Sequence, residues 1–106
     1  MITDARAEDA FEFLRDTVGQ IGAAKAELER SEILRKRARK RVFLGAPEGA
    51  KVAEKEAMAE TDESVAIADD RYVKAILEYE SLRARREIET IALDVWRTES
   101  ANRRRA

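Results

Sequence analysis

The chain has 106 residues, of which 41% are charged and 6% aromatic, and its formal net charge is −1. This profile is typical of long solvated helices rather than of a sheet protein, and the length allows one small domain with a modest core. The chain contains no cysteine, which excludes disulfides and thiolate metal sites. The near-neutral charge argues against a globally basic nucleic-acid binder.

The amino-terminal stretch MITDARAEDAFEF lacks the basic start and apolar core of a signal peptide. No apolar run approaches the roughly 18 residues that a membrane span needs. We therefore expect a soluble cytoplasmic protein with no membrane contact.

The first predicted helix covers residues from about 3 to 44. Apolar residues recur there at spacings of 3, 4, 3 and 7, which places them on one face of a helix. They are Phe11, Leu14, Val18, Ile21 and Leu28, continued by the smaller Ala38 and Val42. Gly19 and Gly22 disfavour helix, so they mark either a hinge or a place where a bulky neighbour needs room, and the pairing register favours the second.

The segment GAPEG, residues 45–49, ends this helix and forms a turn. A second helix is predicted from about 50 to 102, with an apolar seam that repeats at the same spacing. The seam comprises Val65, Ala68, Tyr72, Ala75, Tyr79, Leu82, Leu93 and Trp96. The polar residues 61–64 could break this helix, but an unbroken helix with an exposed polar turn is the favoured interpretation.

A second apolar stripe lies roughly 100 degrees around the second helix from the first seam. It contains Val73, Leu77, Ala84, Ile88, Ile91 and Val95. Because this arc is too wide for one partner helix, we predict a single-domain, all-α, coiled-coil-like antiparallel hairpin over residues 1–106 that oligomerises into a helical bundle. A homodimer is favoured, although trimers and tetramers also fit the seams.

Charge supports the antiparallel hairpin. If both helices start flush with the turn, residue i lies opposite roughly residue 94 minus i. Residues 30–41 carry seven cations and one anion, and residues 48–70 carry eight anions and two cations, so +6 faces −6. Residues 1–20 carry −3 and face +3 on residues 71–86, where Arg83, Arg85 and Arg86 are expected near Glu8, Asp9 and Glu12. The same register sets Gly22 opposite the Tyr72 ring.

The residues offer little for catalysis, because neither histidine nor cysteine is present to act as base or nucleophile. Paired carboxylates such as Glu29 with Glu32 could bind magnesium, as in all-helical nucleotide pyrophosphohydrolases. Their spacing does not reproduce the paired acidic motifs of that family. We expect no enzyme activity and no cofactor or metal.

Two basic clusters are candidates for nucleic-acid contact. Phosphate binding needs Lys and Arg that are free of internal partners. The acidic stretch should neutralise part of the run from Arg35 to Arg41, but some of its residues must point away from the partner helix. The candidates are Lys36, Arg37, Lys40 and Arg41, with Arg103, Arg104 and Arg105 at the tail. The alternative for the tail is that its charge complements the helix macrodipole.

Apolar residues off the main seam are candidates for contact with a protein partner. Four gather near the turn, and Trp96 lies beyond the point where the first helix would run out. They are Ile33, Leu34, Phe43, Leu44 and Trp96. The alternative is that they cap the core of the hairpin itself.

Three short motifs carry a resemblance: EYESLR at residues 78–83, WR at residues 96–97 and ANRRR at residues 101–105. With the turn segment, they make about half of the chain resemble uncharacterised small helical proteins of tailed bacteriophages and prophages. That resemblance implies a phage accessory protein that acts through helical protein contacts in DNA recombination or replication, with phosphate-backbone binding. The alternative is a structural adaptor or inhibitor that binds a host or phage protein without nucleic acid.

Overall fold

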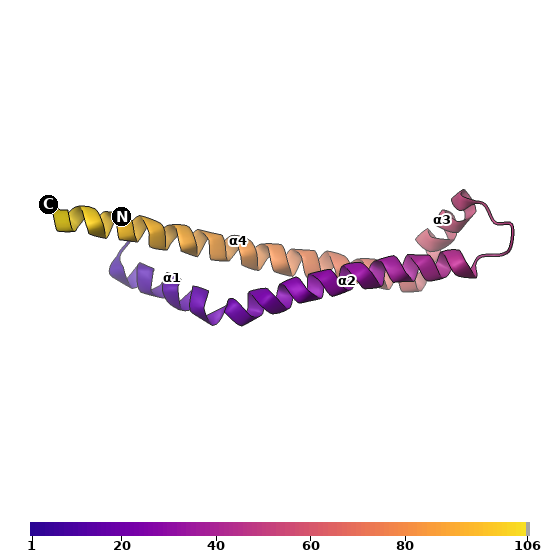
Figure 1. Ribbon diagram of the computed structural model, residues 1–106, viewed down its shortest axis with the longest axis horizontal. Coiled ribbons are helices and arrows are strands. Elements are labelled where there is room, and N and C mark those ends of the chain that lie inside the picture. The colour runs from indigo at the N-terminus through magenta and orange to yellow at the C-terminus, as the bar shows by residue number, and fades with distance from the viewer. Residues whose placement is uncertain (106) are drawn as a thin grey trace. The chain divides into compact units, whose positions relative to one another are not determined.

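The computed structural model describes residues 1–105 and contains helices and no strand over that range. The helices are α1 (Asp4–Asp16), α2 (Val18–Gly45), α3 (Val52–Thr61) and α4 (Glu63–Arg105) (Figure 1). The predicted fold class, an all-α antiparallel helical hairpin, is confirmed.

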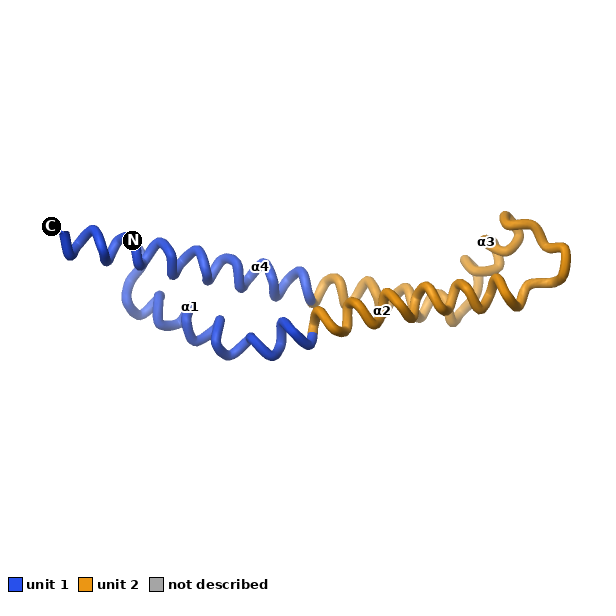
Figure 2. The backbone as a smooth tube through the Cα atoms, in the orientation of Figure 1, with its two compact units in different colours: residues 1–23, 79–106 blue, residues 24–78 orange. Residues whose placement is uncertain are grey.

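Contacts divide the chain into two compact units (Figure 2). Unit 1 consists of Met1–Ala23 with Tyr79–Ala106, and unit 2 is Ala24–Glu78. In unit 1, α1 runs antiparallel to the carboxyl-terminal part of α4. In unit 2, α2 runs antiparallel to the first part of α4, and α3 lies obliquely beside the carboxyl-terminal end of α2 (Figure 1). That the whole chain is one domain stays a prediction.

Small side chains allow α1 and α4 to approach closely in unit 1. Its buried cluster is Ala7, Ala10, Ala92 and Leu93, with Ile2, Leu14 and Trp96 packed against it. The helices are also joined at their ends, where the Ile2 N–H donates to the Glu99 carboxylate over 3.0 Å. Arg6 and Glu89 form a further ion pair between the two helices.

The first predicted helix is interrupted at Thr17, which corrects the expectation of one continuous helix over residues 3–44. The Thr17 backbone leaves helical values, with φ −105 and ψ 5. Its hydroxyl donates to the Phe13 carbonyl over 2.7 Å. From α4, Arg86 donates to the Leu14 carbonyl over 2.8 Å and to the Thr17 hydroxyl. These bonds satisfy polar groups at the helix end.

Unit 2 also has a core of small residues. Its buried residues are Ser31 and Ala38 from α2, Ala59 from α3, and Val65 and Ala75 from α4. The Ser31 hydroxyl is satisfied by donating to the Leu28 carbonyl over 2.9 Å. Polar atoms in this core are therefore paired within the helix, as burial requires.

The second predicted helix is also interrupted, so the favoured unbroken interpretation is wrong. Asp62 has an extended backbone, with ψ 127, between α3 and α4. Its carboxylate accepts hydrogen bonds from the Val65 N–H, at 3.1 Å, and from the Ser64 hydroxyl. These bonds, the Ser64 hydroxyl first, hold the pKa of Asp62 below its usual value. Asp62 thus acts as the N-cap of α4.

The predicted seam of the second helix is confirmed, since its members are buried or half-buried. Two members of the first seam are not, because Phe11 is 55% exposed and Val18 is 61% exposed. Their places are taken by Ala7, Ala10 and Thr17, which are buried. The second apolar stripe of α4, from Val73 to Val95, is exposed throughout.

The predicted pairing register is shifted. It placed Arg35 opposite Ala59, whereas Arg35 bonds Asp69 over 3.0 Å and lies over the Tyr72 ring at 4.8 Å. No atom lies within 4 Å of a Cβ built on Gly22, so this glycine does not make room for Tyr72. The loop of residues 46–51 is longer than the predicted turn of residues 45–49, and this changes the alignment of the two arms of the helical hairpin.

Candidate functional site

The exposed side of α2 in unit 2 carries half of the predicted contact residues. Because Ser31 and Ala38 face the core, residues about half a turn away on the helix face solvent. We call the exposed residues of this side the α2 outer face, and we include the half-buried Leu34 at its edge: Ile33, Leu34, Arg37, Lys40, Arg41 and Leu44. Ile33 is 51% exposed and Leu44 is 77% exposed.

Two neighbouring depressions run along the α2 outer face. One is lined by Leu34, Arg37, Lys40, Arg41 and Leu44. The other is lined by Ala26, Glu29, Arg30, Ile33, Leu34 and Arg37. Because they share Leu34 and Arg37, aliphatic and cationic side chains alternate along one continuous surface of the helix.

The cations of the basic run differ in their partners. Arg35 bonds Asp69 across the hairpin, and Lys36 bonds Glu32 in its own helix over 3.3 Å. Among residues 1–105, Arg37, Lys40 and Arg41 make no ion pair within 4.0 Å. The predicted match of the basic run with the acidic stretch therefore engages Arg35 in an ion pair. The hydrogen bond from the Ser64 hydroxyl and, as a smaller cause, the charge of Arg41 lower the pKa of Asp62. Arg37, Lys40 and Arg41 are exposed cations that make no ion pair with the part of the chain that the structure describes.

A second ion pair crosses the hairpin in unit 2, outside the basic run. Arg71 of α4 donates two hydrogen bonds to Glu27 of α2, over 2.7 and 3.1 Å. These bonds raise the pKa of Arg71 and lower the pKa of Glu27. The pair fixes the alignment of the two helices rather than adding much stability, because both side chains are exposed to solvent.

The arginines of residues 83–86 do not meet Glu8, Asp9 and Glu12 as the register predicted. Arg83 bonds Glu80 in its own helix over 3.4 Å. The Arg85 guanidinium lies 4.0 Å from the centroid of the Phe13 ring, and Arg86 binds the interruption at Thr17. The shifted register accounts for all three differences.

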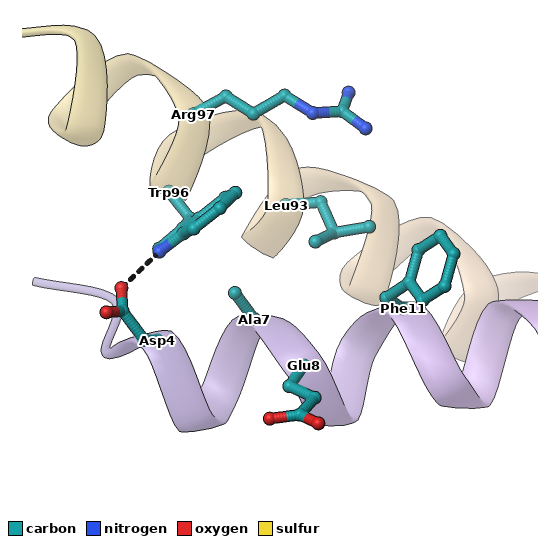
Figure 3. A pocket seen from close by; sticks show the side chains of 7 residues that line it. All are labelled: Asp4, Ala7, Glu8, Phe11, Leu93, Trp96 and Arg97. Atoms are coloured by element: carbon teal, nitrogen blue, oxygen red, sulfur yellow. Dashed lines mark hydrogen bonds between the residues drawn. The ribbon is translucent and has the colours of Figure 1, made fainter.

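Trp96 lies beside the first helix rather than beyond its end. Its indole N–H donates to the Asp4 carboxylate over 2.8 Å, and its ring packs against the core of unit 1. Figure 3 shows Trp96 at one end of a hollow whose other end holds Phe11. Trp96 is therefore partly buried and packs against the core of unit 1. Its contact with a protein partner stays a prediction. Phe43, another predicted contact, is half-buried on α2.

Phe11 is a surface residue that the sequence did not indicate. The spacing of Phe11 from Leu14 predicts that Phe11 lies in the apolar seam. In the structure, the smaller Ala7 and Ala10 are buried between α1 and α4 instead. The signal that could have found it is the run of alanines at positions 7 and 10, which is typical of closely packed helices.

The basic tail lies in the last turn of α4 and is exposed. Arg103 donates to the Ser100 hydroxyl over 3.2 Å, and none of the three arginines makes an ion pair with the part of the chain that the structure describes. Cations at this end of a helix also complement its dipole. The tail belongs to unit 1 and the basic run to unit 2.

Among residues 1–105, no group of three or more acidic side chains is placed to hold a metal ion. Within the same range, none of the helices has an apolar stretch of the length needed to cross a bilayer.

Comparison with protein-family models, curated proteins and solved structures gives no significant match.

Proposed function

We propose that this chain is a non-enzymatic accessory protein that acts by binding another protein through the α2 outer face. The observation that carries the proposal is the composition of one groove, where the unpaired Arg37, Lys40 and Arg41 stand beside Leu34 and Leu44. Its complement is an amphipathic helix with an aliphatic seam and flanking carboxylates.

The aliphatic residues favour a protein ligand over a nucleic acid. Phosphate contacts need cations and gain little from Leu34 or Leu44, whereas single-strand binders add aromatic platforms. The α2 outer face contains no aromatic residue. The resemblance to small phage proteins fits an adaptor or inhibitor that meets its partner in the cytoplasm of the host cell.

Binding to the nucleic-acid backbone is the second candidate, and the same unpaired cations favour it. Arg37, Lys40 and Arg41 have free donors for phosphate oxygens, and Arg103 to Arg105 are a second exposed cluster. Lys36 is the weaker candidate because Glu32 already holds its ammonium. Binding to the nucleic-acid backbone would suit a phage factor in DNA recombination or replication.

Fluorescence anisotropy with two probes separates the candidates. One probe is a synthetic amphipathic helix with leucines at heptad spacing and glutamates on both flanks, and the other is a short DNA duplex. We expect the chain to bind the peptide more tightly at physiological salt, where exposed charge contacts are screened. Tighter binding of the duplex, or no binding of the peptide, would contradict the primary proposal.

Two sets of variants sharpen the comparison. Leu34→Ser with Leu44→Ser should weaken peptide binding at least about tenfold, because the aliphatic contacts are lost, and leave duplex binding unchanged. Replacing Arg37, Lys40 and Arg41 by glutamine should weaken both complexes. Arg83→Gln, which removes an exposed cation in unit 1, is the matched control and should change neither.

A further inference from the structure

The hollow of unit 1 combines aromatic, aliphatic and acidic side chains, and we call it the unit 1 hollow. Its volume is about 320 Å³, at the small end of the range for ligand sites, so it suits a single side chain rather than a whole helix. Figure 3 shows Phe11 and Trp96 at its two ends, with Leu93 between them. The other lining residues are Asp4, Ala7 and Glu8 from α1 and Arg97 from α4.

The two aromatic rings of this hollow have no cation of their own. Elsewhere in unit 1, the Arg85 guanidinium lies 4.0 Å from the centroid of the Phe13 ring. Within residues 1–105, no guanidinium or ammonium lies over Phe11 or Trp96 in this way. Phe11 is 55% exposed, and Trp96 lines the same hollow while its indole N–H bonds Asp4. A cation from outside the chain can therefore reach an aromatic face here.

The carboxylates of α1 supply a negative charge that the chain itself does not neutralise. Asp4 accepts the Trp96 indole N–H through one carboxylate oxygen over 2.8 Å, and Glu8 is exposed. Neither makes an ion pair with the part of the chain that the structure describes. Arg97 also lines the hollow, but its guanidinium bonds Asp94 of the same helix over 3.4 Å. The hollow thus joins an excess of negative charge to open aromatic faces, and its complement is a cation.

A guanidinium fits this combination better than an ammonium does. It is planar and weakly hydrated, so it stacks on an aromatic face at a low cost in desolvation. Its several N–H groups also donate to carboxylates while it is stacked. The aliphatic stem of an arginine packs on an apolar surface, which Leu93 provides at the centre of the hollow.

We propose that the unit 1 hollow binds one arginine side chain of a partner protein. The stem lies on Leu93, the guanidinium stacks on an aromatic face of the hollow, and its N–H groups donate to Asp4 and Glu8. The site is independent of the α2 outer face, because the hollow belongs to unit 1 and the α2 outer face to unit 2.

Trp96 reports on this site directly, since it is the only tryptophan of the chain. Titration of the full chain with a short capped glycine peptide that carries one arginine should change the Trp96 emission until it saturates. The same peptide with citrulline, which keeps the shape and loses the charge, should bind at least about tenfold more weakly. The absence of a saturable change with the arginine peptide would overturn the proposal. Equal binding of the citrulline peptide, or of one with leucine, would overturn it as well.

Single substitutions locate the site. Glu8→Gln and Phe11→Ala should each weaken binding of the arginine peptide by about three- to tenfold, because one removes a carboxylate and the other a ring face. Both residues are exposed, so the helical circular dichroism should be unchanged. Glu56→Gln removes the same charge from an exposed position of α3 in unit 2 and is the matched control. Unchanged binding in Glu8→Gln and Phe11→Ala, or an equal loss in Glu56→Gln, would refute the assigned site.

The other available occupant is the basic tail of a second copy, residues 103–105. If the tail filled the hollow, the Trp96 emission per chain would change on dilution, and replacing Arg103, Arg104 and Arg105 together by glutamine would abolish that change. This result would overturn the assignment to a partner protein. We expect the tail variant and the wild-type protein to have the same emission and the same affinity for the arginine peptide.

Discussion

At the scale of one residue, a substitution of Gly22 tests the stability of α2. It lies in the exposed part of α2, and a Cβ added there meets nothing within 4 Å. We expect Gly22→Ala to raise the free energy of unfolding by about 0.5–1 kcal/mol, because alanine restricts the unfolded chain without a clash. Urea unfolding measures the change. Gly49→Ala is the opposite control, since Gly49 has φ +84 and should resist any side chain. A loss of stability in Gly22→Ala would show a contact that we have not found.

Arg86 binds the junction of α1 and α2, and we expect its removal to lower the free energy of unfolding. The Leu14 carbonyl and the Thr17 hydroxyl both accept hydrogen bonds from it, and Thr17 is buried. Arg86→Ala leaves these acceptors without their donor in a partly buried site, so we expect a loss of about 1–3 kcal/mol in urea unfolding. Arg83→Ala, which breaks an exposed pair three residues away, should change stability by less than about 0.5 kcal/mol. Equal effects of the two variants would refute the role of Arg86.

Most of the candidate cations could be named from the sequence, but their availability could not. Whether an arginine is free depends on the direction in which it leaves the helix and on the alignment of the partner helix. The pairing of Lys36 with Glu32 is an exception, because a separation of four residues on one helix predicts it. Trp96 was misplaced for a different reason, which is that its contact with Asp4 depends on the register.

At the scale of the elements, the spacing of apolar residues predicted helices well and their interruptions poorly. The spacing of apolar residues predicts which face of a helix is buried, and the predicted seam of α4 is indeed buried or half-buried. The ends at Thr17 and Asp62 are set instead by local hydrogen bonds from side chains, which leave the periodicity almost unchanged. The register was missed because buried small residues such as Ser31 and Ala38, and not the turn alone, determine where the helices pack.

Asp62 is expected to stabilise the start of α4 in a pH-dependent way. Asp62→Ala removes the acceptor for the Val65 N–H and the Ser64 hydroxyl, so the melting temperature at pH 7 should fall by a few degrees. The folded pKa of Asp62 lies below the ordinary value of 3.8. The stabilisation is therefore complete above the unfolded pKa and is lost as the pH falls through the folded one. Thermal melts from pH 7 into acid measure it.

Asp62→Asn separates the hydrogen bonds from the charge. Asparagine also caps helices but does not titrate, so this variant should melt close to the wild-type protein at pH 7 and keep its cap in acid. The difference between wild type and Asp62→Ala should shrink in acid, while the difference between Asp62→Asn and Asp62→Ala should persist. If both differences persist unchanged, the carboxylate charge at Asp62 contributes nothing.

At the scale of the molecule, the described residues bury small side chains and expose larger ones. The buried apolar residues are six alanines with Val65 and Leu93, whereas many isoleucines and leucines are exposed. Alanine gains little free energy on burial, so a chain of 106 residues packed in this way has a narrow margin of stability. The second stripe of α4 was predicted from the sequence because it is a property of one helix, independent of register.

A second copy that covered the exposed apolar stripe of α4 would couple folding to association. If the face of Ile88 and Ile91 is covered by a second copy, unfolding releases two chains, and the melting temperature must rise with protein concentration. We expect a rise of several degrees across a hundredfold concentration range, followed by circular dichroism at a wavelength that reports helix. Ile88→Glu with Ile91→Glu should melt at a lower temperature that no longer depends on concentration, and Ile33→Glu should behave as the wild-type protein. A wild-type melting temperature that is constant across this range would mean that the chain is stable by itself, and the small-residue core would then have to be sufficient without a partner.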